Sequence, residues 1–251
     1  MHFVHENAED EERMIRFRDK LKRSSALVYI SNFAKESTHK YFDVPNIPEY
    51  VIYNGNTIIE TSFPQDFKPE LVPSKPYLFT IGEFTARKNF HTLIEMLRFL
   101  PNHQLVLAGN NDKSYFTVIK ELVKKYNLEN QVYFTGKISE MAKKYYLKNC
   151  SGFVFPSLRE GFGIPPIEAM QYGKTVFMSN NTSLPEIGLS LATYWDHYEP
   201  EYMAQTVING LKYYNDNKIE LTKKLIAHAQ TFSLEKAAKE YIEVYKRVLG
   251  V

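Results

Sequence analysis

The sequence is poor in the residues that build covalent cross-links and thiolate metal centres. It has one cysteine, Cys150, in 251 residues, which excludes an intrachain disulfide and a cysteine-based zinc site. No apolar run approaches the roughly 18 residues that a transmembrane helix needs, and the acidic, polar start of the chain is not typical of a signal peptide. These absences indicate a reducing compartment, so we expect a cytoplasmic protein.

The charges of the chain are almost balanced. Lysine and arginine number 31 and aspartate and glutamate 29, which gives a formal net charge of +2. A protein that binds nucleic acid electrostatically needs a clustered basic field, so this balance excludes that class. The hydrophobic fraction of 44% is enough to fill a sizeable core, and a length of 251 residues allows one large domain or two modest ones.

The first 75 residues predict a short α/β segment followed by a linker. A helix is predicted over residues 9–23, where acidic residues precede basic ones in the order that complements a helix dipole. An apolar strand over residues 26–30 and a helix over residues 33–42 follow. Prolines then recur from Pro45 to Pro76, and this composition predicts a linker over residues 46–75.

From Pro76 onward, apolar strands alternate with helical patterns of about 10–15 residues. Strands are predicted over residues 77–81, 104–108, 132–134, 152–155, 175–177 and 192–194. The helices between them are predicted over residues 89–99, 113–126, 139–149 and 165–172, and three more over 201–214, 219–230 and 234–248. This alternation predicts βαβ units and a parallel sheet, and therefore the α/β class.

The most informative stretch runs from Pro156 to Met170, between an apolar strand and a helix. Gly161 and Gly163 let the backbone approach a ligand closely, and the N–H groups at the helix start form an anion site suited to a phosphate. Glu160 lies in the loop, and Glu168 is expected in the first turn of the helix. Carboxylates beside a phosphate site suggest hydrogen bonds to diols, as in dinucleotide sites. We expect both side chains to line a cleft that solvent reaches.

A second constellation lies where the first strand of the alternating region ends. Arg87 and Lys88 precede a helix expected to begin near Asn89, at the sheet edge where ligands bind in doubly wound folds. Arginine offers a two-pronged fork to phosphate, and lysine a point charge. Taken singly, an Arg-Lys pair is more often exposed to solvent on the protein surface. Each glutamate taken alone can be explained as a solvated loop charge or as a charge that favours a helix N-terminus. The two constellations together favour a phosphate-binding function.

These motifs resemble those of a known family. The spacing from Glu160 to Glu168 matches an E-x7-E motif, and from about Val51 onward the chain resembles the C-terminal half of a family 4 retaining glycosyltransferase with the GT-B fold. The matching stretches are, in order, Tyr53–Gly55, Gly82–Asn89, Thr135–Ser139, Pro156–Met170 and Ser183–Ile187.

The resemblance implies a role for each site residue. Arg87 and Lys88 would hold the donor diphosphate, and these two with Glu160 are the expected catalytic residues. Glu168 would bind ribose. Glu160 would meet the donor sugar, together with the backbone of residues Gly161–Ile164, which we call the glycine loop. The loop at Lys137 would lie against the nucleobase. The expected substrate-binding residues are Gly82, Lys137, Ile138, Gly161, Phe162, Gly163, Ile164 and Glu168.

The resemblance also predicts the fold and its domains. Members of this family have two Rossmann-like domains, with the acceptor site in the N-terminal one. Residues 1–45 resemble only the last helix–strand–helix portion of that domain, and the family's glycine-rich N-terminal loop has no counterpart here. We expect an incomplete N-terminal domain remnant over residues 1–45, a linker over 46–75, and a Rossmann-like nucleotide-sugar-binding domain with a parallel sheet over 76–232. A C-terminal helix over 233–251 is expected to pack back on the N-terminal part.

The implied reaction is transfer of a hexose, with retention, from a GDP- or UDP-sugar, without a metal or a cofactor. The expected setting is bacterial surface polysaccharide assembly, with a glycan or lipid-linked acceptor and a peripheral contact at the inner face of the cell membrane. Two alternatives stay open. One is a donor-binding module that is inactive without a partner chain carrying the N-terminal domain, and the other is a GT-B sugar-nucleotide epimerase. The E-x7-E spacing together with Arg-Lys-Asn favours a transferase over an epimerase.

Overall fold

The computed structural model describes residues 8–58, 61–64, 66–112 and 114–251. It divides into two compact units, a smaller one formed by Met1–Gly55 with Phe232–Val251 and a larger one formed by Asn56–Thr231. The residues expected to form a linker, 46–75, are divided between these units. Residues 1–7 of the expected remnant lie outside the described part of the chain.

The larger unit is built on a parallel sheet of six strands, which confirms the predicted α/β class. The strands are nearly continuous apolar runs, and all five residues of β4 are buried, as expected where helices cover both faces of a sheet. Their spatial order is β5-β4-β3-β6-β7-β8. The bounds are β3 Tyr77–Ile81, β4 Gln104–Ala108, β5 Val132–Gly136, β6 Gly152–Phe155, β7 Val176–Ser179 and β8 Thr193–Trp195.

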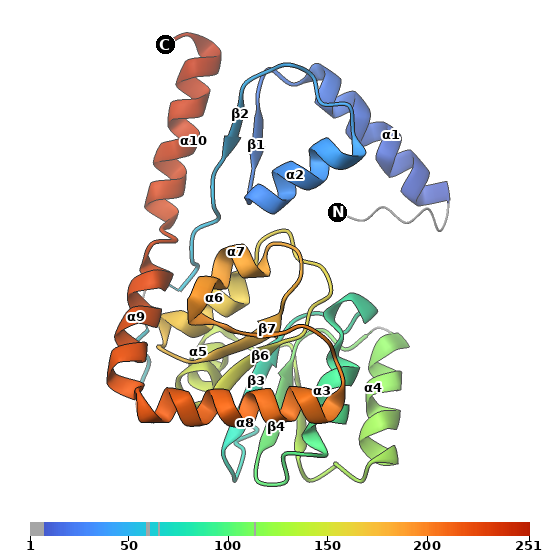
Figure 1. Ribbon diagram of the computed structural model, residues 1–251, viewed down its shortest axis with the longest axis vertical. Helices are drawn as coiled ribbons and strands as arrows, with labels where there is room; N and C mark the ends of the chain where they lie inside the picture. The colour runs from blue at the N-terminus through green and yellow to red at the C-terminus, as the bar shows by residue number, and fades with distance from the viewer. Residues whose placement is uncertain (1–7, 59–60, 65, 113) are drawn as a thin grey trace. The chain divides into compact units, whose positions relative to one another are not determined.

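Two groups of helices cover this sheet. The helices α3, α4 and α8 pack together on one side of it, and α5, α6 and α9 on the other (Figure 1). One core cluster lies between the sheet and the first group, where Phe84, Phe90 and Trp195 are almost fully buried. Phe79, Phe153 and Tyr146, which pack on one another, are buried as completely but belong to a different part of the core. The bounds are α3 Phe90–Leu97, α4 Ser114–Lys125, α5 Glu140–Asn149, α6 Ile164–Gln171, α7 Leu184–Gly188, α8 Pro200–Asp216 and α9 Lys218–Gln230.

The strand order creates a switch point between β3 and β6. The chain runs from β3 outward to β4 and β5, and then returns to β6 on the other side of β3. The loops that leave β3 and β6 therefore start from adjacent strands and lead to helices on opposite faces, and in doubly wound sheets ligands bind at such a switch point, at the carboxyl edge of the sheet. The two motifs singled out in the sequence are these two loops.

Glycines let the strand ends approach one another closely at this edge. Gly109 follows β4 with φ of +141°, and a Cβ atom there would lie 1.8 Å from the carbonyl oxygen of Gly82. The backbone N–H of Gly82 donates a hydrogen bond to the carbonyl oxygen of Ala108, and the N–H of Gly109 donates one to the carbonyl oxygen of Gly136. Only a glycine fits at Gly109, because both its backbone conformation and the space exclude a side chain.

Both expected helix starts beside the site lie within one residue of the observed starts, but the local details differ. Arg87 and Lys88 lie in a 3-10 turn, Ala86–Lys88, and Asn89 adopts a left-handed conformation with φ of 59° before α3 begins at Phe90. Because α6 begins at Ile164, Glu168 is its fifth residue and lies beyond the first turn.

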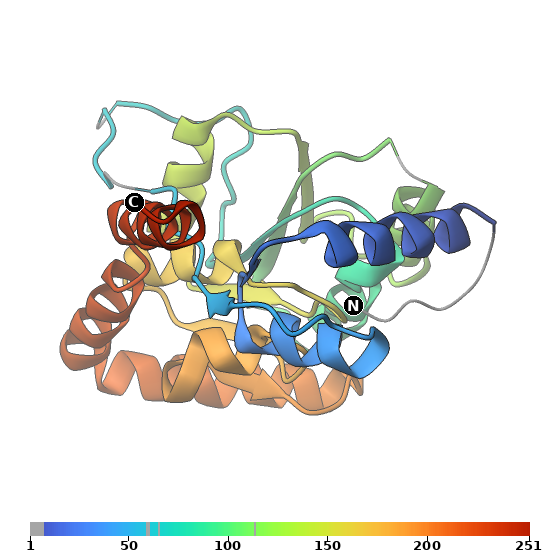
Figure 2. The same ribbon diagram turned by 90° about the horizontal axis from the view of Figure 1, so that it is seen from above.

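The smaller unit contains a parallel pair of strands between helices. Its elements are α1 Ala8–Arg23, β1 Leu27–Tyr29, α2 Asn32–Tyr41, β2 Glu49–Val51 and α10 Leu234–Leu249. Figure 2 shows α10 on one side of the strands and α1 on the other. Ala237 and Val244 of α10 pack with Ile52 just after β2, and Met14 and Leu21 of α1 form a second cluster with Phe42.

Candidate functional site

Three side chains from the β3 and β6 loops meet at one oxygen atom. Glu160 accepts hydrogen bonds at Oε1 from Lys88 Nζ at 2.6 Å, from Arg87 at 3.1 Å and from the Ser157 hydroxyl at 2.6 Å. The structure therefore brings together the three residues expected to be catalytic. Ser157 was not predicted, and its only sequence signal is its place in the Pro156–Met170 motif.

Backbone contacts hold the two loops in this arrangement. The Leu158 N–H donates to the carbonyl of Arg87 at 2.8 Å, and the Arg87 guanidinium donates to the carbonyl of Arg159 at 2.7 Å. The Glu160 N–H donates to the hydroxyl of Thr182 at 3.0 Å. The charged groups of the two loops are therefore held in fixed positions by the fold.

Lys88 is buried although it carries a charge. Its Nζ lies 4.7 Å from the centre of the Phe155 ring, and its side chain is 10% exposed. Burial lowers the pKa of the Lys88 ammonium, and the charge and hydrogen bond of Glu160 oppose this shift. A Cβ atom at Gly82 would lie 3.2 Å from Lys88 Cε, so Gly82 leaves the room that the lysine stem occupies.

A side chain outside the glycine loop also fixes the position of this loop before α6. The Ser183 hydroxyl donates to the carbonyl oxygens of Glu160 and Phe162, at 3.0 and 2.7 Å. Gly163 has φ of +126°, a conformation that glycine adopts readily. Prolines supply the second and third residues of α6, and proline has no N–H. The donors for an anion are therefore fewer than a regular helix start offers, and the residues at 161–164 must supply most of them.

Glu168 lies in a buried ion pair. Its Oε1 accepts a hydrogen bond from Lys143 Nζ at 2.8 Å, and another from the Thr57 hydroxyl. Its side chain is 5% exposed and that of Lys143 10%. The expectation that Glu168 lines a solvent-reached cleft is wrong, because α5 supplies a lysine that covers it. Sequence reasoning missed Lys143, whose only signal was a basic residue within an otherwise amphipathic helix.

The charge of Lys143 is maintained by its partners. Burial lowers the pKa of Lys143, but hydrogen bonds and charges from Glu168 and from the exposed Glu140 raise it more, so the net shift is upward. Nearby, the Tyr172 hydroxyl is buried without a hydrogen-bonding partner among the described residues. Burial, followed by the charge of Glu168, raises the pKa of Tyr172.

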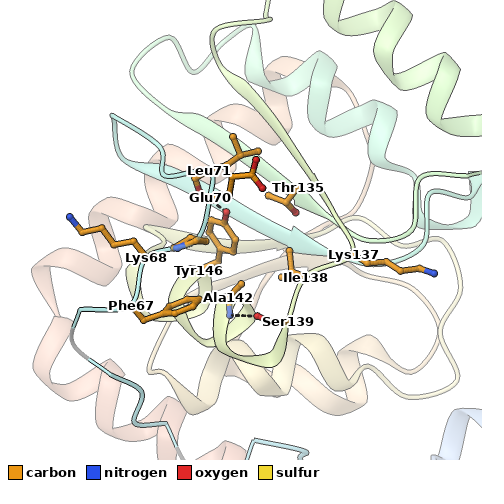
Figure 3. A pocket seen from close by; sticks show the side chains of 11 residues that line it. Phe67, Lys68, Glu70, Leu71, Thr135, Lys137, Ile138, Ser139, Ala142 and Tyr146 are labelled. Carbon is orange, nitrogen blue, oxygen red and sulfur yellow. Dashed lines mark hydrogen bonds between the residues drawn. The ribbon is translucent and has the colours of Figure 1, made fainter.

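A pocket of about 280 Å³ lies beside the Lys137 loop. In Figure 3 the side chains of Glu70, Leu71, Tyr146 and Ile138 gather around it, whereas the Lys137 ammonium points away. Neither the Arg87–Lys88 pair nor the two site glutamates line it. Its lining residues are Phe67, Lys68, Pro69, Glu70, Leu71, Thr135, Lys137, Ile138, Ser139, Ala142 and Tyr146.

Within the described ranges, no helix has the length and apolar character to cross a membrane. The same residues contain no group of three or more histidine, cysteine, aspartate or glutamate side chains arranged to hold a metal ion.

The family model of glycosyl transferases group 1 matches residues 62–194, a little more than half of the chain. The chain belongs to this family. The match includes the β3 and β6 loops, the Lys137 loop and both site glutamates.

Curated glycosyltransferases are similar over most of the chain. The serotype-specific mannosyltransferase WbdA of Escherichia coli is 28% identical over 244 residues, which cover 90% of this chain and 29% of that protein. O-antigen chain mannosyltransferase B of E. coli is 30% identical over 176 residues, which cover 68% of this chain and 45% of that protein. The chain thus spans less than half the length of these two relatives.

Solved glycosyltransferase structures share the fold. Anabaena HepE, solved in complex with UDP and glucose, superposes with a TM-score of 0.80 at 18% identity, covering 97% of this chain and 68% of that one. Sucrose-phosphate synthase from Thermosynechococcus elongatus gives 0.77 at 23% identity, covering 96% and 62%.

Proposed function

We propose that this member of the glycosyl transferases group 1 family binds a nucleotide-diphosphate sugar and transfers the hexose with retention, in the assembly of a bacterial surface polysaccharide. The observation that carries the proposal is the meeting of Arg87, Lys88 and Glu160 at the β3–β6 switch point, beside the glycine loop. The E. coli relatives are mannosyltransferases, one of them for the O-antigen chain, which supports the polysaccharide setting.

The two cations suit the charge that develops during transfer. When the bond between the anomeric carbon and the diphosphate breaks and the acceptor oxygen takes its place, negative charge grows on the leaving diphosphate. Arg87 and the buried Lys88 would stabilise that charge from fixed positions, which is effective because the site does not have to reorganise. The diphosphate would replace Glu160 as the partner of both cations and leave the carboxylate to meet the donor sugar.

The rest of the donor would extend toward α5. Glu168 would accept hydrogen bonds from the ribose, and the pocket beside Lys137 and Ile138, at about 280 Å³, would hold the base. The acceptor would be a glycan or a lipid-linked glycan. The alternative is a donor-binding module that is inactive without a partner chain carrying the N-terminal domain.

Binding and turnover test this proposal in turn. The melting temperature is measured with GDP, UDP, and the nucleosides guanosine and uridine. One diphosphate should stabilise the protein, by about 2.7 kcal/mol at 100 times Kd, and its nucleoside far less. The absence of a shift with either diphosphate at millimolar concentration contradicts the proposal.

Incubation with GDP-mannose or UDP-glucose and a lipid-linked glycan then separates enzyme from module. Release of nucleoside diphosphate with an α-linked product from an α-linked donor, observed by NMR, supports retaining transfer. Binding without turnover, restored by adding a chain that carries an N-terminal domain, supports the module. Interconversion of the sugar nucleotide without transfer identifies an epimerase.

A further inference from the structure

The ion pair between α5 and α6 has a high desolvation cost for a contact that only joins two helices. The Lys143 ammonium and the Glu168 carboxylate lie 2.8 Å apart with side chains 10% and 5% exposed. Removing two charges from water costs several kcal/mol per ion, and apolar residues of similar volume often replace such a pair without loss. The pair therefore calls for a role beyond joining two helices.

The geometry of the carboxylate indicates what that role is. Both hydrogen bonds to Glu168, from Lys143 and from Thr57, reach the same oxygen, Oε1. Among the described residues, Oε2 has no donor. An ionised carboxylate has about four acceptor positions on its two oxygens, so one oxygen is anchored while the other keeps its capacity to accept.

We propose that Lys143 is a positioning residue that holds the Glu168 carboxylate in a fixed orientation, so that Oε2 accepts hydrogen bonds from the vicinal hydroxyls of a nucleoside diphosphate's ribose. This inference rests on the proposed function, because it assumes that a nucleotide occupies the site. Without the ammonium, the Thr57 hydroxyl is the one donor left to Oε1 among the described residues, so the carboxylate loses the contact that fixes where Oε2 points.

The partners of Lys143 keep it suited to this task. Its second carboxylate, Glu140, lies 2.9 Å away and is 76% exposed, so the ammonium is anchored toward solvent as well as toward Glu168. The net upward shift of the Lys143 pKa keeps it charged at neutral pH. Thr57 adds a neutral donor to Oε1 and restricts the rotation of the carboxylate.

The test compares each nucleotide with its form lacking the ribose hydroxyls. Calorimetry gives the Kd of GDP and 2′,3′-dideoxy-GDP, and of UDP and 2′,3′-dideoxy-UDP. For the wild-type protein we expect the dideoxy form to bind about 10- to 100-fold more weakly, since hydrogen bonds to a charged group are lost. In Lys143→Met, we expect the complete nucleotide to weaken until this ratio falls to about threefold or less, whereas Lys143→Arg retains most of it.

The matched control is Lys144→Met, at the next residue of the same helix. In the described structure Lys144 forms no ion pair with Glu140 or Glu168, so this variant should keep the wild-type ratio. A lysine that only joins α5 to α6 would lower the melting temperature and weaken both ligands equally, so an unchanged ratio in Lys143→Met overturns the inference. If Lys143→Met does not fold, Lys143→Gln carries the same test, with the same two outcomes. If neither GDP nor UDP binds the wild-type protein, the proposed function fails, and this inference fails with it.

Discussion

Replacing Lys88 by methionine tests the phosphate site directly. Methionine keeps most of the length of the side chain, but it removes the ammonium that lies 2.6 Å from Glu160 Oε1 and 4.7 Å from the centre of the Phe155 ring. Arg87, at 3.1 Å, and Ser157, at 2.6 Å, still donate to that oxygen. The perturbation is therefore confined to one charge in a site whose other groups stay in place.

Two magnitudes follow from this geometry. Breaking a buried pair costs about 3–5 kcal/mol when one charge is left uncompensated. Because Glu160 retains two donors, we expect a smaller loss in the free energy of unfolding, about 1–2 kcal/mol. For a nucleoside diphosphate, the loss of one charge-assisted hydrogen bond is worth about 1.5–3 kcal/mol, or about 10- to 100-fold in Kd.

The assay is calorimetric titration of GDP, UDP and the matching nucleosides into wild type, Lys88→Met and the exposed control Lys124→Met. We expect the diphosphate to lose affinity in Lys88→Met, whereas the nucleoside binds equally to all three proteins. Equal losses for nucleoside and diphosphate would refute the reasoning, because Lys88 would then shape the site without contacting phosphate.

Glu160→Gln should have the opposite effect in the same titration. The carboxylate neutralises Arg87 and Lys88, so a diphosphate must compete with it for both cations. Removing its charge should strengthen diphosphate binding several-fold, because both cations lose a strong competitor. The intact nucleotide sugar should gain less, since its sugar hydroxyls lose a charged acceptor. Weaker diphosphate binding in Glu160→Gln would contradict this competition.

Three further predictions concern the fold. Gly109→Ala should destabilise the larger unit by more than about 2 kcal/mol in urea unfolding, because the new Cβ would meet the Gly82 carbonyl at 1.8 Å; a loss below 1 kcal/mol would show that the strand ends separate easily. Burial raises the pKa of Glu49, but hydrogen bonds from His39 and Lys35 and the charges of these two side chains lower it more. Glu49→Gln should therefore cost about 1 kcal/mol at pH 7, and this difference should begin to shrink as the pH falls below the carboxyl's ordinary 4.5 and disappear once the pH is below the lowered pKa of the folded state; a difference that does not shrink on acidification would contradict the charge as its cause. Burial raises the pKa of Cys150 to about 12, so a thiol reagent at pH 8 should react only along the unfolding transition, and fast labelling of the native protein would refute its burial.

The sequence alone determined the architecture of the larger unit. Periodicity predicted six strands and the helices between them, because each strand is an apolar run whose pattern is local. The loop motifs also identified Arg87, Lys88 and Glu160 as a candidate site. The carboxyl ends of parallel strands share one edge of the sheet, so residues at the ends of two strands can be placed together without a structure. Their roles toward a nucleotide sugar stay predictions.

Only the tertiary structure decided how the charges of the site are paired. Thr57 and Glu168 are 111 residues apart and Lys88 and Glu160 are 72 apart, and no local period relates such positions. The burial of Glu168 depends on α5 lying beside α6, which turns Lys143 from an ordinary helical lysine into its partner. In the same way, contacts with the β6 loop hold the 3-10 turn that contains Arg87. Periodicity reports which face of an element is apolar, whereas the partner of a buried charge is set by the packing of elements distant in the chain.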